Sequence, residues 1–238
     1  MVDAAYMSAT TEMVSQKLAA DIFSNTQKAV ADFSGNNEEV LQGSQAFIDN
    51  LREALSRGEI LEHEVARILE AVRFAAEKHK DQKRKNPSQT PYIIHPIGVS
   101  RTLLTLGNVR DTDVLIGALL HDTVEDTETT FEEIRGRFGA RVEGIVRELT
   151  DDKSLPKQER KRLQIVNAPH KSLEAAQIKL SDKLYNLNDL ARVPPADWSQ
   201  ERIDEYFKWA KEVVDALPDA NPAVKAAVDQ VIRSHWGV

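Results

Sequence analysis

The sequence predicts an all-α fold, and three observations support that prediction. Apolar residues recur at helical spacing along nearly the whole chain, and no segment shows the strict alternation of a half-buried strand. Gly and Pro number only 10 and 9 of 238 residues, and together with Asn, Asp, Ser and Thr they bound the periodic segments. No long Pro-, Ser- or Gly-rich linker and no internal repeat interrupts the chain.

Residues 1–58 are expected to form a helical hairpin. Residues 34–37 (Ser-Gly-Asn-Asn) supply stop and start signals, and Asn36 with Glu39 resembles a capping box. Gly58 suits the position just after a helix end. The apolar residues of the first helix are Met13, Val14, Leu18, Ile22, Val30 and Phe33, and those of the second are Val40, Leu41, Phe47, Ile48, Leu51 and Leu55.

This N-terminal part differs in charge from the rest of the chain. The whole chain has a net charge of −7, and residues 1–60 carry four basic and nine acidic side chains. Because the hairpin offers no clustered His, we expect it to serve packing or partner docking rather than chemistry, with a homo-oligomer formed through it as one option. The expected organisation is an extension at 1–60 followed by a catalytic domain at 61–238.

Helical signals continue from Leu61 to the end of the chain. Asp111 can cap one of the later helices, and both Thr129 and Thr130 are followed three residues later by Glu, as in a capping box. Trp198 is expected in the core. The expected helices are 62–80, 96–106, 111–124, 130–138, 140–149, 155–167, 172–192, 199–217 and 221–235.

Composition excludes several functional classes. With no Cys, the chain cannot hold disulfides, zinc ribbons or iron–sulfur clusters, so any metal must bind to His and carboxylates. The longest apolar run, residues 114–120, is far shorter than the roughly 20 residues of a membrane span. An acidic chain argues against nucleic acid as a partner, and Gly-rich phosphate loops are missing. We expect a cytoplasmic location because no secretory signal is visible.

The unusual residues concentrate around a His-Asp doublet at the end of a buried apolar run. A single His there would most often be a core residue, but Asp122, Glu125 and Asp126 crowd around His121 within one turn. Like charges at that spacing repel unless a cation or proton lies among them. His nitrogen with carboxylate oxygen suits Mn, Fe or Zn, and Glu125 or Asp126 would then orient an activated water.

Four ordered segments carry a family resemblance. They are residues 90–99 (TPYIIHPIGV), 121–127 (HDTVEDT), 149–153 (LTDDK) and 179–187 (KLSDKLYNL). The separated His, the His-Asp doublet and the later Asp resemble the HD-domain phosphohydrolases. The longer segments resemble the alarmone hydrolases, which are the hydrolase half of the RelA/SpoT enzymes, and their single-domain relatives, which include an animal SpoT homologue.

The resemblance implies an HD-domain helical bundle over about residues 62–217 and a specific reaction. Such enzymes bind one Mn²⁺ and remove the 3′-diphosphate of ppGpp or pppGpp as pyrophosphate, which leaves GDP or GTP. By resemblance, the metal ligands would be His95, His121, Asp122 and Asp182, with Glu125 and Asp126 as the catalytic pair that activates water. Substrate contacts by resemblance would be Arg84, Lys85, Lys157, Asn186, Arg202 and Tyr206.

Charge patterning independently supports a polyphosphate substrate. Residues 78–85 and 153–162 each contain five cationic side chains in a chain that is acidic overall. Such runs are often only solvated helix ends. Beside a carboxylate-rich centre, however, they can offset the charge of an approaching nucleotide polyphosphate.

Two other functions remain open at this stage. A phosphatase that acts on another nucleotide with a ribose phosphate, notably NADPH, would need the same metal centre, and such an activity is attributed to animal relatives. A catalytically silent helical module that senses a nucleotide is the alternative outside enzymes. The intact Glu125 and Asp126 count against that second alternative.

Overall fold

Helices make up the regular structure of the computed structural model, which describes residues 21–237. Within that range, strand-type pairing is limited to an isolated antiparallel bridge between Lys83 and Pro91, so the predicted all-α fold is confirmed. Residues 21–34 are helical. The helices that follow are α2 (Glu38–Ser56), α3 (Glu62–Lys78), α4 (Ile94–Thr105), α5 (Thr112–Leu120), α6 (Thr123–Asp126), α7 (Phe131–Phe138), α8 (Ala140–Leu149), α9 (Lys157–Asn167), α10 (Leu173–Arg192), α11 (Gln200–Ala216) and α12 (Pro222–Trp236), with a short 3₁₀ turn at Ala168–His170.

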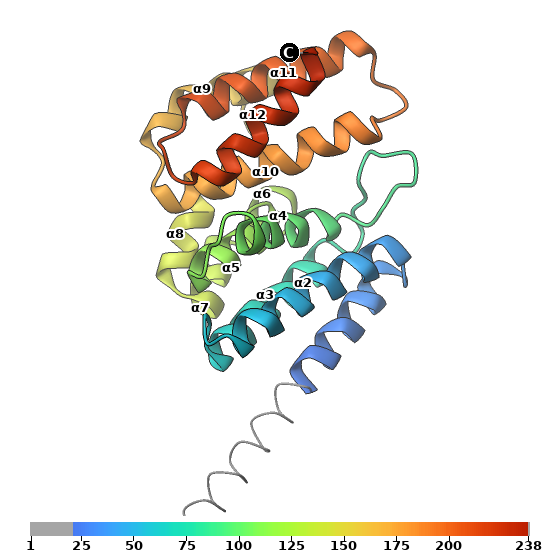
Figure 1. Ribbon diagram of the computed structural model, residues 1–238, viewed down its shortest axis with the longest axis vertical. Coiled ribbons are helices and arrows are strands. Elements are labelled where there is room, and N and C mark those ends of the chain that lie inside the picture. Colours follow the sequence, from blue (N-terminus) through green and yellow to red (C-terminus); the bar gives the residue numbers. More distant parts are fainter. Residues whose placement is uncertain (1–20, 238) are drawn as a thin grey trace, which may run out of the picture.

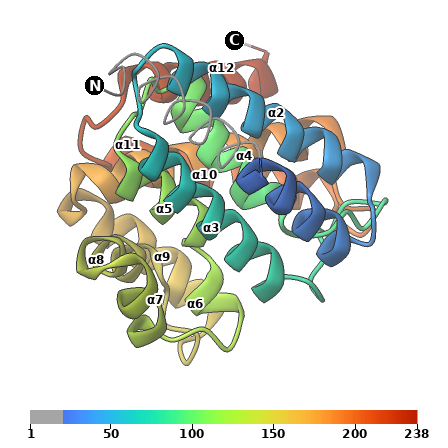
Figure 2. The same ribbon diagram turned by 90° about the horizontal axis from the view of Figure 1, so that it is seen from below.

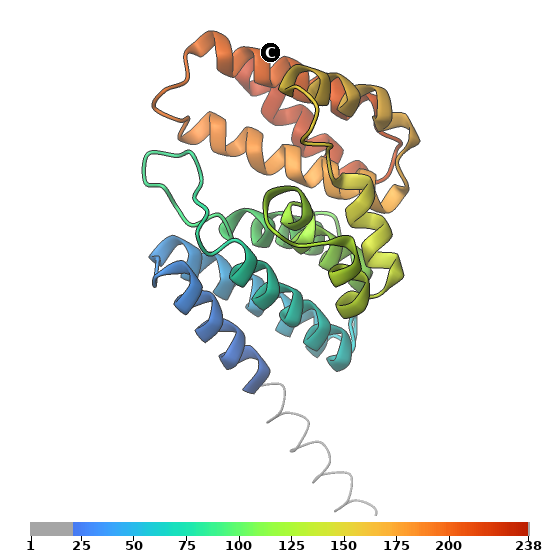
Figure 3. The ribbon, with the colours of Figure 1, turned by 180° about the vertical axis from the view of Figure 1, so that it is seen from behind.

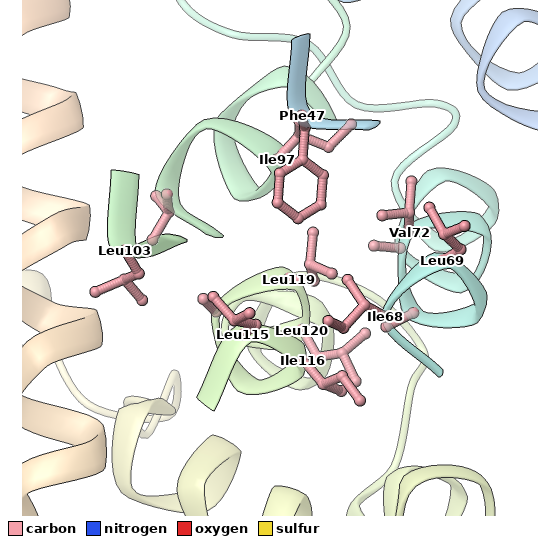
Figure 4. Close-up of a cluster of buried hydrophobic side chains, with 14 of the residues drawn as sticks. Phe47, Ile68, Leu69, Val72, Ile97, Leu103, Leu115, Ile116, Leu119 and Leu120 are labelled. Carbon is pink, nitrogen blue, oxygen red and sulfur yellow. The ribbon is translucent and has the colours of Figure 1, made fainter. Parts of the chain in front are cut away.

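The helices stack in tiers (Figure 1). Helices α2 and α3 form one side, α4 and α5 lie in the middle, and α10, α11 and α12 form the other side (Figures 1 and 3). Viewed from below, α3 crosses in front of α5 and α10 (Figure 2). The buried apolar side chains of α2, α3, α4 and α5 meet in one cluster (Figure 4) that includes Phe47, Ile68, Val72, Ile97 and Leu115.

The N-terminal hairpin packs into this same cluster. Val40, Phe47, Ile48 and Leu51 of α2 are buried there. The cap of α2 lies one residue later than expected, because Asn37 rather than Asn36 accepts the amide hydrogen of Val40. Asn36 instead takes a left-handed conformation in the turn. Met13, Val14 and Leu18 of the expected first helix lie outside the described residues.

The expected single helix at 111–124 is wrong, because the chain divides it into α5 and α6. Asp111 caps α5 as predicted. At the other end, the imidazole Nδ1 of His121 lies 2.8 Å from the carbonyl oxygen of Ala118, and the hydroxyl of Thr123 donates to that of Leu120 at 2.7 Å. Because these side chains bind the last-turn carbonyls, α5 stops and the His-Asp doublet lies in the break.

The remaining boundaries agree with the expected ones to within about two residues, as is usual for helix ends. Thr130, and not Thr129, caps α7. A second apolar cluster joins α10, α11 and α12 around Phe207 and Val228. Helix α10 also packs against α4 and α5 and so links the two clusters. None of the described helices is long and apolar enough to cross a membrane.

Candidate active site

The four predicted metal ligands come from three helical segments that meet in the middle of the molecule. His95 lies in the first turn of α4, and Asp182 lies in the middle of α10. His121 and Asp122 occupy the break between α5 and α6. His95 and His121 are only 1% and 2% exposed. The contact of α10 with α4 and α5 therefore brings all four side chains together.

The ligand atoms of His95, His121 and Asp122 all lie within 4.8 Å of one another, and Asp182 lies beside the two imidazoles. Nε2 of His121 lies 3.0 Å from Oδ2 of Asp122 and 3.9 Å from Oδ1 of Asp182. Nε2 of His95 lies 3.6 and 3.3 Å from the same two oxygens. Nitrogen and oxygen ligands about 2.0–2.2 Å from one ion lie roughly 3–3.6 Å from their neighbours. Three of the four separations fall in this range, so His95, His121 and Asp122 form a candidate site for one divalent metal ion. Asp182 lies at its edge, 3.9 Å from His121.

The hydrogen bonding of His121 supports this fit. Its Nδ1 lies 2.8 Å from the carbonyl oxygen of Ala118, and a carbonyl can only accept, so Nδ1 carries the hydrogen. Nε2 is then the nitrogen that faces the carboxylates of Asp122, at 3.0 Å, and Asp182, at 3.9 Å. That atom is buried. A carbonyl that orients one imidazole nitrogen is the usual partner of a metal-binding His, whose other nitrogen gives up its proton when the ion binds.

The buried charges favour a cation between the two carboxylates. Burial lowers the pKa of His95 to about 4. Burial also acts to lower the pKa of His121, but the charge of Asp122 outweighs it and raises that pKa to about 9. The charge of Lys183 holds the pKa of Asp182 well below its ordinary value despite burial. Both carboxylates are thus ionised and available as ligands at neutral pH.

Two tyrosines fix the ligands from either side. The hydroxyl of Tyr92 donates to Oδ2 of Asp122 at 2.5 Å. The ring of Tyr185 packs edge-on against His95, with 5.0 Å between ring centroids. A Cβ at Gly98 would lie 2.0 Å from Cε2 of Tyr185, so the ring reaches His95 only because residue 98 has no side chain. Sequence analysis assigned no role to either tyrosine, although both lie within the resembling segments.

The two predicted catalytic carboxylates lie beside the ligands. Asp126 follows Asp122 by one helical turn, with its amide donating to the Asp122 carbonyl at 2.9 Å, and its carboxylate contacts Lys153. Glu125 accepts the amide hydrogen of Asp151 at 3.0 Å and lies 3.5 Å from Arg160. Because α5 ends before Glu125, that side chain is held by these contacts and not by a continuous helix with His121. Burial raises the pKa of Glu125.

The six predicted substrate contacts line two adjoining cavities. A cavity of about 730 Å³ has Lys85, Lys157, Arg202 and Tyr206 in its wall, and Glu125 also lines it. A smaller one, of about 200 Å³, is lined by Arg84, Lys85, Asn186 and Tyr206 among others. Both cavities share Lys85, Trp198 and Tyr206, so a ligand could extend through both.

Arg84 is linked through Asn186 to Asp182, one of the predicted metal ligands. The guanidinium of Arg84 donates to Oδ1 of Asn186 at 2.9 Å and to Oδ2 of Asp189 at 2.8 Å. The amide nitrogen of Asn186 donates to Oδ1 of Asp182 at 2.7 Å. These residues therefore form a polar chain from the smaller cavity to a predicted ligand.

Sequence reasoning missed several residues of the cavities. Trp198 was expected in the core, but it is half-buried and lines both cavities. Arg160 and Lys161 also line the larger cavity, and the second basic run was the signal that could have selected them. Outside the cavities, Lys183 was also missed: its ammonium lies 3.3 Å from Oδ2 of Asp182 and 4.3 Å from the centre of the Trp209 ring. Its position next to Asp182 in the sequence was the available signal.

Comparison with known families agrees with this geometry. The HD domain family matches residues 71–208, which is more than half of the chain and includes all four candidate ligands. The chain belongs to the HD domain family. In the HD domain of this chain, the doublet that names the family is His121-Asp122 at the end of α5.

The HD domain also has close relatives of known name. The guanosine-3′,5′-bis(diphosphate) 3′-pyrophosphohydrolase MESH1 of Xenopus tropicalis is 58% identical over 168 residues, which cover 71% of this chain and 94% of that protein. The MESH1 protein of Homo sapiens is 53% identical over 170 residues, which cover 71% of this chain and 95% of that protein. A solved structure described as a metazoan orthologue of SpoT that hydrolyses ppGpp is 51% identical, with a TM-score of 0.70, and covers 71% of this chain and 95% of that one.

Proposed function

We propose that this protein is a Mn²⁺-dependent (p)ppGpp 3′-pyrophosphohydrolase, which converts ppGpp or pppGpp and water into GDP or GTP and pyrophosphate. The observation that carries the proposal is the cluster of His95, His121 and Asp122, with Asp182 beside it. Glu125, close to this cluster in the sequence, lines a large cavity that also has five Lys and Arg side chains in its wall. The names of relatives more than 50% identical over most of their length support the same substrate.

The four ligands are proposed to hold one divalent ion, which when bound supplies Lewis-acid activation of a water nucleophile. The ligand set of two imidazoles and two carboxylates suits Mn²⁺, Fe²⁺ or Zn²⁺ better than Ca²⁺ or Cu⁺. We choose Mn²⁺ among them on the family resemblance. His121 would bind the ion through Nε2 and lose any proton there, because its Nδ1 hydrogen is used by the carbonyl of Ala118.

The chain's own carboxylates are proposed to handle the proton of the attacking water. Glu125 lines the larger cavity, and its raised pKa suits a base that must take up a proton near neutral pH. Asp126, paired with Lys153, would orient the water. Attack on the 3′-phosphorus breaks the bond to the ribose 3′-oxygen, which takes up a proton as pyrophosphate leaves.

Cationic side chains would bind the polyphosphate. Lys85, Lys157, Arg160 and Lys161 face the larger cavity together with Arg202. Carboxylates also line this cavity, and we propose that the cationic side chains are the ones that contact the phosphates and stabilise their charge. The half-buried rings of Trp198 and Tyr206, with centroids 5.9 Å apart, offer an apolar surface for a nucleobase.

Product analysis of the purified full chain tests this proposal. With ppGpp and Mn²⁺ we expect GDP and pyrophosphate in equal amounts, and no turnover once the metal is chelated. NADPH is offered in a parallel reaction, since a phosphatase for that nucleotide would use the same centre. If the protein releases phosphate from NADPH and leaves ppGpp intact, NADPH is the substrate and our proposal is wrong. If the metal-loaded protein hydrolyses neither nucleotide, a sensing module is favoured.

A further inference from the structure

The basic loop that carries Arg84 and Lys85 is anchored by a residue outside the matched HD domain. This loop spans residues 83–91, between α3 and α4, and lies at one end of the molecule beside the start of α2 and the end of α10 (Figures 1 and 3). Glu39, in the first turn of α2, accepts a hydrogen bond of 2.8 Å from the hydroxyl of Thr90. The HD domain match begins only at residue 71.

Thr90 is the centre of the loop's internal hydrogen bonding. Its carbonyl accepts the amide hydrogen of Arg84 at 2.8 Å, and its own amide donates to Oδ1 of Asn86 at 3.0 Å. Its hydroxyl lies 2.9 Å from Nδ2 of Asn86 and 3.1 Å from Oγ of Ser88. Because Thr90 is only 1% exposed, water cannot readily replace these partners.

Glu39 decides how that hydroxyl is used. A hydroxyl can donate one hydrogen and accept two. An amide NH₂ can only donate and an ionised carboxylate can only accept, so Thr90 accepts from Asn86 and gives its single hydrogen to Glu39. Ser88 must then donate to the remaining lone pair. With Glu39 present, the donor and the acceptor are therefore defined in every hydrogen bond of the Thr90 hydroxyl.

Glu39 is also linked to Arg84 indirectly, through Arg192 and Asp189. Arg192 lies 3.6 Å from Glu39 and 3.7 Å from Asp189, and Asp189 binds Arg84. Arg192 is 69% exposed, so these ion pairs contribute little alone. The buried end of the Glu39 interaction is Thr90, and that hydrogen bond is the part expected to matter.

We propose that Glu39 of the N-terminal hairpin is a positioning residue that holds the loop of residues 83–91 in the conformation in which Arg84 and Lys85 receive substrate phosphate. An ordered loop need not be immobilised when the substrate binds, which lowers the entropic cost of binding. Glu39 therefore acts on substrate affinity and not on the chemical step. This departs from the expectation that the hairpin serves packing or docking alone, and it rests on the proposed function for its substrate.

Steady-state kinetics of the full Mn²⁺-loaded chain with ppGpp test the proposal. We expect Glu39→Ala to raise KM about 3- to 10-fold with kcat within about twofold, which is the scale of one ordinary hydrogen bond, because the Glu39 side chain is 44% exposed. Glu38→Ala is the matched control, since it removes a neighbouring acid from the same helix turn. Thr90→Val should raise KM similarly, and Thr90→Ser should keep the wild-type KM. Combining Thr90→Val with Glu39→Ala should raise KM little beyond either single variant.

Hydrogen exchange of the same variants provides a readout that needs no turnover. Glu39→Ala should speed amide exchange in residues 83–91 and leave α5 unchanged, whereas Glu38→Ala should change neither. If the wild-type chain fails to hydrolyse ppGpp, the proposed function falls, and affinity for pyrophosphate then replaces KM as the measure of binding. A Glu39→Ala variant that matches Glu38→Ala in exchange, or in KM or pyrophosphate affinity, overturns the positioning role.

Discussion

Side chains at the centre of this molecule place charged groups close together. His121 donates from Nδ1 to a backbone carbonyl, while its buried Nε2 lies 3.0 Å from Asp122 and 3.9 Å from Asp182. Two neighbouring buried carboxylates repel each other unless a cation or proton lies among them. A divalent metal ion is the cation that we propose for this position, and it would take the place of a proton on Nε2.

Substituting a ligand should therefore remove the metal. We expect His121→Ala or Asp122→Ala to lower metal affinity more than about 100-fold, since even residues that only orient ligands contribute about 10- to 100-fold. Turnover should fall with it. Metal content after gel filtration, measured by elemental analysis, checks this. The exposed His63 provides the control variant His63→Ala, which should keep its metal. A fully metallated and active Asp122→Ala variant would refute the ligand assignment.

Substituting the proposed base should separate metal binding from chemistry. Glu125→Gln should keep the metal and lose about 10²-fold or more in kcat, the usual scale for a general base. A base works only when deprotonated, so the raised pKa of Glu125 moves the acid-side loss of activity to a pH above 4.5. The rate of the wild type from pH 4 to 9 measures this acid-side loss, which the Glu125→Gln variant should not show. Loss of metal from Glu125→Gln would instead make Glu125 a ligand.

At this scale the sequence was informative where residue type and spacing decide the chemistry. The His-Asp doublet, with Glu125 and Asp126, predicted a metal centre, and His95, His121 and Asp122 indeed form a candidate site. Spacing could not reveal the contact of Tyr92 with Asp122 or that of Thr90 with Glu39, because each joins residues at least 30 positions apart. Such contacts depend on how helices pack, which local pattern does not determine.

Helix boundaries show the same division between local and distant causes. Asp111 and Thr130 cap their helices as predicted, because a cap depends on residues within one turn. The break after α5 was missed, since the apolar pattern continues through it. Only the side chains of His121 and Thr123, which bind carbonyls of the preceding turn, end the helix there.

Two glycines in helices should respond in opposite ways to the same substitution. Gly98→Ala in α4 would push a Cβ to 2.0 Å from the Tyr185 ring that packs on His95. We expect a loss of about 1–3 kcal/mol in the free energy of unfolding, as for other overpacked sites, with weaker metal retention. Gly144→Ala in α8 meets nothing within 4 Å and should gain about 0.5–1 kcal/mol. Urea unfolding with and without metal measures both, and equal effects would contradict the packing argument.

At the scale of the whole molecule, one apolar cluster runs from the N-terminal hairpin to α10. It includes Phe23 and Phe47 from the first 60 residues, and Ile178 from α10. The division at residue 60 stays a prediction, and the family match from residue 71 to 208 agrees with where the chemistry lies. Because α2 is buried in the shared cluster, we nevertheless expect the N-terminal hairpin and the remaining helices to unfold cooperatively.

Removing Phe47 should therefore destabilise the distant C-terminal helices as well. Phe47 is 1% exposed, and replacing a buried Phe by Ala costs about 3–5 kcal/mol. All three tryptophans of the chain, Trp198, Trp209 and Trp236, lie in its last 41 residues, so their fluorescence reports only that region, whereas circular dichroism reports every helix. We expect Phe47→Ala to shift both transitions to lower urea concentration together.

Leu61→Ala provides the matched control, because Leu61 is 56% exposed and its truncation should cost less than about 0.5 kcal/mol. The two midpoints should coincide in the wild type, in Leu61→Ala and in Phe47→Ala. If Phe47→Ala instead lowers only the dichroism midpoint and leaves the tryptophan transition in place, the hairpin unfolds as a separate unit. That result would favour the division at residue 60, because α2 would then be a detachable element rather than part of one cooperative core.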